Sequence, residues 1–85
     1  MCIINTGAII EHECTIGHFS HVSVGSVLCG NVEIGDSVFI GANSTIRNGL
    51  KIKDYAIVGM GSCVIKNIGQ NEYVAGNPAT FLRRR

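Results

Sequence analysis

Titratable side chains crowd together at one place in this sequence, the run Glu11-His12-Glu13. A histidine flanked by carboxylates has the composition of a general base, which takes a proton from a reacting group during catalysis. The same composition also suits a surface histidine in a polar turn. These three residues alone do not choose between the two interpretations.

The other residues that could hold a metal are spaced unfavourably for one. Cys2, Cys14, Cys29 and Cys63 never approach a C-x-x-C spacing, and the histidines complete no zinc-finger pattern. We therefore expect no structural metal site. We also expect reduced thiols in a cytoplasmic protein. The opening Met-Cys-Ile-Ile has no basic region and nothing downstream approaches the length of a membrane span, which predicts a soluble chain without a membrane partner.

Length and charge limit the function classes further. A chain of 85 residues has room for one small domain, which repetition or partners must help to stabilise. Seven basic against six acidic residues give a net charge of +1, which argues against a nucleic-acid partner. Hydrophobic residues make up 46% of the chain but aromatic residues only 6%, so the core must be aliphatic.

The element that must position these residues is indicated by an aliphatic residue at every sixth position. The repeat consists of Ile4, Ile10, Ile16, Val22, Leu28, Ile34, Ile40, Ile46, Ile52, Val58 and Val64. Two positions before each aliphatic residue lies a residue of small or medium size, as in Ala8, Ser26 and Ser44. Residues two apart in a strand face the same way, so both positions point inward and the rest of each six makes a corner.

This pattern matches the hexapeptide repeat of left-handed parallel β-helices, in which three sixes close a triangular coil of about 18 residues. We therefore predict an all-β, hexapeptide-repeat solenoid. A β-sandwich is the alternative, but it predicts turn signals every 8 to 12 residues or so. Gly17, Gly35, Gly41 and Gly59 directly follow the aliphatic position, where we expect a bend with positive φ.

Residues 18 apart should then stack on one another about 4.8 Å apart and form three flat faces. The outward residues of the first face are Ile3, His21, Phe39 and Ile57, those of the second face are Ile9, Val27, Thr45 and Cys63, and those of the third face are Thr15, Glu33 and Lys51. The first and second faces are largely apolar, which usually marks an interface, and we predict a homotrimer. A monomer with scattered surface aliphatics is the alternative.

The six-residue period fails after Val64. We assign residues 1–68 to the β-helix coils and residues 69–85 to a loop, a short extended segment and a tail of the same domain. Pro78 forbids helix at Asn77, and residues 80–85 are expected to form one terminal turn. Its arginines 83–85 are typical of a solvated tail, with a phosphate site as the alternative.

Three segments together are specific for one family: residues 5–17 (NTGAIIEHECTIG), residues 21–25 (HVSVG) and residues 75–79 (AGNPA). On these segments, residues 5–79 resemble the C-terminal half of the sialic-acid O-acetyltransferase and nucleotide-linked 4-amino-sugar N-acetyltransferase family. The resemblance implies an acyltransferase that moves an acetyl group from acetyl-CoA to an amine or hydroxyl of a sugar or nucleotide-linked sugar.

The resemblance also implies residue roles. His12 is the base that removes a proton from the acceptor as it attacks the thioester carbonyl, with Glu13 raising its basicity and no acyl-enzyme formed. His21 contacts acetyl-CoA together with the backbone around Ala42 and Met60, and Asn5 positions the acceptor or the thioester. Cys14 is a less suitable nucleophile, because its register points it inward as a packing residue.

Two other functions remain as alternatives. The γ-class carbonic anhydrases use this fold with three zinc-binding histidines, but His12 and His18 fall at different corners and His21 on a flat face. A non-catalytic scaffold is the second alternative. Members of the acetyltransferase family carry an N-terminal α/β domain that holds the acceptor, whereas this chain starts inside the β-helix. We therefore expect a fragment or a shortened gene product, whose acceptor the sequence does not name.

Overall fold

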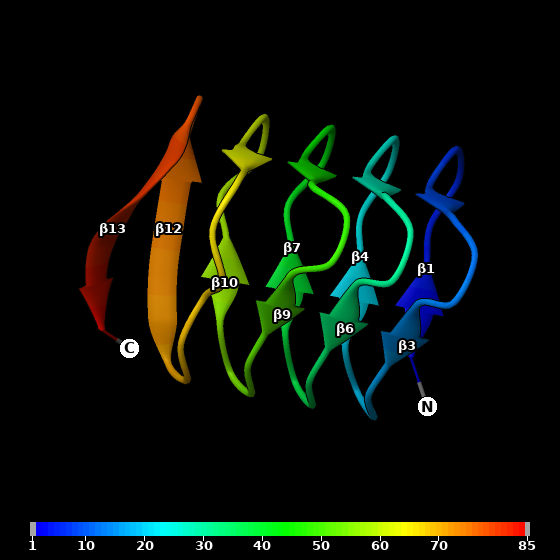
Figure 1. Ribbon diagram of the computed structural model, residues 1–85, viewed down its shortest axis with the longest axis horizontal. Coiled ribbons are helices and arrows are strands. Elements are labelled where there is room, and N and C mark those ends of the chain that lie inside the picture. The colour runs from blue at the N-terminus through cyan, green and yellow to red at the C-terminus, as the bar shows by residue number, and fades with distance from the viewer. Residues whose placement is uncertain (1, 85) are drawn as a thin grey trace.

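The computed structural model describes residues 2–84 as short strands wound into three-sided coils (Figure 1). The two-residue strands follow one another at the predicted spacing of six. They are β1 (Ile3–Ile4), β2 (Ile9–Ile10), β3 (Thr15–Ile16), β4 (His21–Val22), β5 (Val27–Leu28), β6 (Glu33–Ile34), β7 (Phe39–Ile40), β8 (Thr45–Ile46), β9 (Lys51–Ile52), β10 (Ile57–Val58) and β11 (Cys63–Val64). Two longer strands, β12 (Glu72–Gly76) and β13 (Ala79–Arg84), follow. No helix occurs among the described residues, and the predicted all-β solenoid is confirmed.

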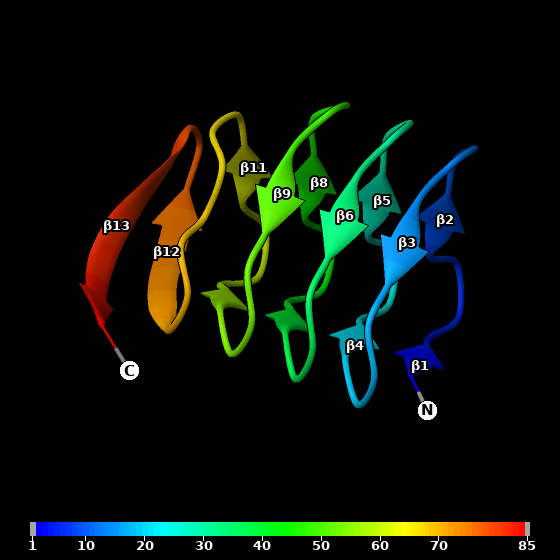
Figure 2. The same cartoon turned by 60° about the horizontal axis from the view of Figure 1, so that its bottom comes forward.

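Every third strand from β1 to β11 belongs to the same sheet, and β12 and β13 extend the first sheet, as two views of the ribbon show (Figures 1 and 2). The sheets run β1-β4-β7-β10-β12-β13, β2-β5-β8-β11 and β3-β6-β9. The parallel pairs Ile3↔His21 and Thr15↔Glu33 are each 18 residues apart. The predicted coil length and the composition of the three faces are therefore confirmed.

The interior of the prism is aliphatic, as composition predicted. Val22, Leu28, Ile40 and Ile46 are completely buried. Each such side chain stabilises the fold by about 1.5–3 kcal/mol relative to an exposed one. Ile4, in the first coil, is 42% exposed because it lies at an end of the described stack of coils, where only one neighbouring coil covers it.

The second inward position holds a serine in four repeats, and each of these hydroxyl groups donates to a backbone carbonyl. Ser20 donates to the Gly35 carbonyl at 2.6 Å, and Ser26 donates to the Gly41 carbonyl at 2.8 Å. A buried hydroxyl without such a partner would destabilise the fold. The small inward residues therefore both leave room for the aliphatic side chains and tie successive strands together.

The expectation of positive φ at Gly17, Gly35, Gly41 and Gly59 was wrong. Positive φ occurs two residues later, at the second residue of each turn, as in Phe19 (60°) and Asn43 (58°). At Gly17, Gly35, Gly41 and Gly59 a side chain would instead meet atoms of the next coil, which approaches closely there. An added Cβ on Gly41, for example, would lie 2.5 Å from the Met60 backbone nitrogen.

The chain departs from the six-residue period between β11 and β12. Ile68 is buried and bridges in parallel with Ile52, only 16 residues away, so this coil is two residues shorter than the others. The Asn67 side chain accepts a hydrogen bond from the Lys51 backbone nitrogen at 2.8 Å. A side chain thus supplies a bond that carbonyl oxygens supply elsewhere in the stack.

The terminal turn expected over residues 80–85 is instead strand β13, within the described residues. It pairs antiparallel with β12 after the turn at Asn77 and Pro78. Arg84 lies 3.9 Å from the Glu72 carboxylate, and the Arg83 guanidinium lies 5.2 Å from the centre of the Tyr73 ring. The strand forms because β12 offers it an unpaired sheet edge. Arg85, also assigned to the tail, lies outside the described residues.

Candidate active site

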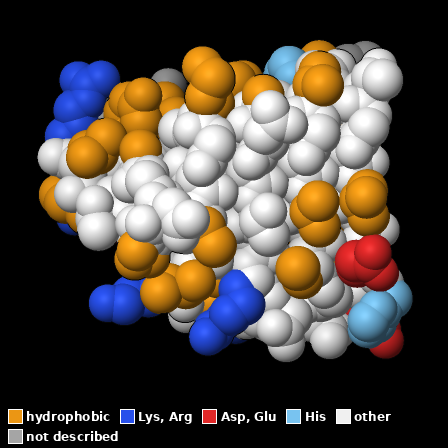
Figure 3. All heavy atoms as spheres, turned by 90° about the horizontal axis from the view of Figure 1, so that it is seen from above, with side chains coloured by type: hydrophobic (Ala, Val, Ile, Leu, Met, Phe, Trp, Pro, Cys, Tyr) orange, Lys and Arg blue, Asp and Glu red, His pale blue; other side chains and the backbone are white. Residues whose placement is uncertain are grey.

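His12 lies at the corner between β2 and β3, in a two-residue turn with Glu13. Glu11, His12 and Glu13 are all exposed. The acidic side chains visible in Figure 3 gather with a histidine at one corner of the molecule, whereas hydrophobic side chains are spread across that face. The backbone of the turn is fixed, because the His12 carbonyl accepts a hydrogen bond from the Asn31 nitrogen at 3.0 Å.

The side chain of His12 is held by packing and not by a polar partner. Within residues 2–84 no hydrogen bond or ion pair joins its imidazole to Glu11, Glu13 or any other side chain. Its ring lies instead over Gly30, one coil further along the stack. The imidazole nitrogens are therefore accessible to a substrate at the surface, as a general base requires.

The structure brings together two further candidate residues, Asn5 and His21. The Asn5 amide nitrogen lies 2.8 Å from His21 Nε2. An amide nitrogen only donates, so His21 Nε2 accepts and the ring proton resides on Nδ1. This tautomer leaves His21 with a donor for a carbonyl oxygen.

His21 has the neighbour that the spacing of 18 predicted, Phe39, to which the sequence analysis gave no role in the site. The Phe39 ring packs edge-on against the His21 imidazole, with 5.2 Å between ring centres. The two residues are paired one coil apart in β4 and β7, so the spacing of 18 already contained this contact. Phe39 and Asn5 together fix the orientation of His21.

Ala42 and Met60 lie in adjacent coils at the corner between the first and second faces. The Gly61 nitrogen donates to the Ala42 carbonyl at 2.8 Å, and Met60 is 80% exposed. This corner precedes β8 and β11, whereas His12 follows β2. The two groups therefore lie at opposite ends of the strands of one sheet. The chain by itself does not bring His12 to the Ala42 and Met60 corner.

The remaining candidates lie where the register predicted. The Cys14 thiol donates to the Cys29 carbonyl at 3.1 Å and packs against the core, which confirms that its position is inward. His18 is in a different turn from His12, and His21 is in a strand. Across residues 2–84, no three His, Cys, Asp or Glu side chains gather closely enough to hold a metal ion. The same residues include no helix with the length and apolar character needed to span a bilayer.

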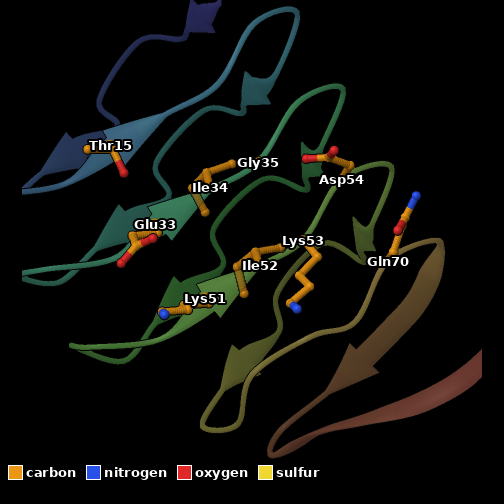
Figure 4. Close-up of a pocket in the computed structure, with 9 residues that line it drawn as sticks. All are labelled: Thr15, Glu33, Ile34, Gly35, Lys51, Ile52, Lys53, Asp54 and Gln70. Atoms are coloured by element: carbon orange, nitrogen blue, oxygen red, sulfur yellow. The ribbon is translucent and has the colours of Figure 1, made fainter.

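The third face carries a hollow that is separate from the candidate residues. Figure 4 shows its lining, which consists of Thr15, Glu33, Ile34, Gly35, Lys51, Ile52, Lys53, Asp54 and Gln70. Two acidic and two basic side chains balance its charge. The hollow therefore offers no clear preference for an anionic ligand.

The repeat that builds these corners is shared with known transferases. Residues 31–66 match the family described as bacterial transferase hexapeptide (six repeats). A putative acetyltransferase of Bacillus subtilis (strain 168), YvoF, is 40% identical over 79 residues, which cover 93% of this chain. The chain therefore contains the bacterial transferase hexapeptide repeat, and the relatives that it resembles are acetyltransferases by name. A second relative, a 2,3,4,5-tetrahydropyridine-2,6-dicarboxylate N-acetyltransferase of Staphylococcus aureus (strain bovine RF122 / ET3-1), is 36% identical over 78 residues, or 82% of this chain.

This hexapeptide-repeat chain spans less than half the length of those relatives, 45% of the first and 33% of the second. Among solved structures, LpxA from Acinetobacter baumannii superposes with a TM-score of 0.96 at 29% identity, covering 98% of this chain and 32% of LpxA. A perosamine N-acetyltransferase from Caulobacter crescentus (H141N mutant), solved with CoA and GDP-perosamine, has a TM-score of 0.74 at 18% identity. The superposition covers 96% of this chain and 53% of the perosamine N-acetyltransferase, so the two proteins share the fold.

Proposed function

We propose that this chain is the catalytic β-helix of an acetyl-CoA-dependent sugar acetyltransferase. The acceptor is an amine or a hydroxyl of a sugar or nucleotide-linked sugar, and free thiols support a cytoplasmic location. The exposed His12, held on a fixed turn between two glutamates, carries the proposal. Acetyltransferase relatives and the resemblance of residues 5–17 to the amino-sugar N-acetyltransferases support it.

His12 acts as the general base. Its imidazole takes the proton from the acceptor nitrogen or oxygen, which forms a bond to the thioester carbonyl carbon of acetyl-CoA. The carbon–sulfur bond then breaks, and the leaving CoA thiolate takes the proton back from the imidazolium. The acetyl group moves directly to the acceptor, and His12 returns to its neutral form. The family resemblance gives Glu13, the second residue of the same turn, an assisting role in this step.

His21 and the Ala42 and Met60 corner bind acetyl-CoA. Because Asn5 occupies His21 Nε2, the Nδ1 proton of His21 is available to a carbonyl oxygen of the donor. The small residues at the corner allow a ligand to approach the backbone around Ala42 closely. Asn5 thereby positions the donor through His21.

Coenzyme A should stabilise the folded chain. A ligand at one hundred times its dissociation constant raises the free energy of unfolding by about 2.7 kcal/mol. We expect a rise in Tm with coenzyme A in wild type, a much smaller rise in His21→Ala, and a wild-type response in the control Lys51→Ala on the third face. Thermal unfolding monitored by fluorescence or circular dichroism measures this. An unchanged Tm in wild type at millimolar coenzyme A would favour a non-catalytic scaffold.

We also expect a homotrimer in solution. Ile3 is 49%, Ile9 50% and Phe39 42% exposed, so apolar side chains lie bare on the first and second faces. A closed three-fold assembly covers two faces of each triangular subunit and sets the His12 corner of one subunit against the Ala42 and Met60 corner of the next. Light scattering should give three times the chain mass of 9.1 kDa. A stable monomer at micromolar concentration contradicts the trimer.

A further inference from the structure

Gly30 lies directly beneath the His12 ring. A Cβ added to Gly30 would lie 2.8 Å from His12 Cε1, 2.9 Å from Nε2 and 3.4 Å from Nδ1. These are its three nearest atoms, so the imidazole is what an added side chain would meet first. At Gly41, by contrast, the nearest atoms belong to the backbone of the next coil. Glycine at residue 30 therefore leaves room for the His12 imidazole, whereas Gly41 leaves room for the backbone of the next coil.

The backbone at this position does not require glycine. Gly30 is the first residue of its turn, and its φ lies outside the left-handed range. The first turn residue in the other six-residue units carries many kinds of side chain: Thr6, His12, His18, Val24, Asp36, Ala42, Asn48, Asp54 and Met60. Glycine occurs at this register position only beneath His12.

The backbone of Gly30 cannot easily move away from the ring. The Asn31 nitrogen donates to the His12 carbonyl, and the Gly49 nitrogen donates to the Gly30 carbonyl, each at 3.0 Å. A methyl group at residue 30 would therefore displace the imidazole, which is the mobile end of an exposed side chain.

We propose that Gly30 is a positioning residue that seats the His12 imidazole. The proposal of a catalytic consequence rests on the proposed role of His12 as the base. Because no polar partner within residues 2–84 holds the ring, its packing on Gly30 restricts its orientation. A base displaced by about 1 Å can lose about 10²-fold in rate.

The substitution Gly30→Ala tests the seat. We expect its urea midpoint to remain close to that of wild type, because the exposed ring can swing aside. The NMR signals of the His12 ring should shift, whereas those of His18 and His21 stay in place. Turnover should fall by about 10- to 100-fold while the KM for acetyl-CoA is unchanged, since the acetyl-CoA site is elsewhere.

Gly69→Ala is the matched control, because the three atoms nearest to its added Cβ belong to the Glu72 carboxylate, the closest at 3.2 Å. It should leave the His12 signals and turnover unchanged. In a His12→Ala background, Gly30→Ala should lower turnover no further, because the residue it positions is gone. A further loss in that background would contradict the proposal.

The remaining outcomes distinguish the contact between Gly30 and His12 from the proposed catalytic function. Unchanged NMR signals of the His12 ring in Gly30→Ala contradict the proposed positioning of His12 by Gly30, whatever the turnover. Shifted signals combined with no acetyl transfer by wild type support the seat and overturn the proposed function instead. If Gly30→Ala fails to fold, recovery of folding in the double variant with His12→Ala supports the contact, and failure in both backgrounds overturns it.

Discussion

Replacing His12 by alanine should lower the rate of acetyl transfer by about 10²- to 10⁴-fold, the range typical of losing one general base. The acceptor would then have to lose its proton to water as it attacks the thioester. Coenzyme A binding should be nearly unchanged, because within one chain His12 and the Ala42 and Met60 corner lie at opposite ends of the strands of one sheet. Turnover at saturating acetyl-CoA with an amino-sugar nucleotide acceptor measures the effect.

The matched control is His18→Ala, which removes an exposed histidine from the corresponding position of the next turn. It should retain near wild-type turnover. The pair His12→Ala and His21→Ala separates chemistry from donor binding: the first lowers kcat, and the second weakens binding of coenzyme A. Unchanged turnover in His12→Ala would remove the proposed base from the mechanism.

Replacing Ile40 by aspartate should unfold the chain. Ile40 is completely buried in a narrow prism whose described interior contains only aliphatic side chains, small residues and hydrogen-bonded serines. A carboxylate there has neither water nor a cation as a partner, and we expect a loss of more than about 4 kcal/mol. Such a loss approaches the whole stability of a small domain. Circular dichroism and urea unfolding measure it.

Two milder substitutions calibrate this prediction. Ile40→Val should cost about 0.5–1.5 kcal/mol, because it only leaves a small cavity. Lys51→Ala should change the urea midpoint little, since Lys51 is exposed on the third face. Equal midpoints for Ile40→Asp and Lys51→Ala would mean that the inward and outward positions have been assigned wrongly.

The sequence alone predicted the coils, their length of 18 residues and the residues on each face. It could do so because every strand in a solenoid pairs with strands at one fixed separation, so a local period specifies long-range contacts. The pairing of His21 with Phe39 follows from that separation. So does the inward position of Cys14. The corner that bears His12 was likewise placed by counting in sixes.

The tertiary structure decided what depends on distances between side chains and neighbouring coils. The glycines after the aliphatic positions looked like residues of positive φ, but the close approach of the next coil explains them. The shortened coil that buries Ile68, and strand β13 on the edge of β12, break the period and so left no periodic signal. The bond between Asn5 and His21, and the seat of His12 on Gly30, depend on which way two side chains turn. A six-residue repeat fixes where a side chain begins, and the packing around it decides where its reactive atoms lie.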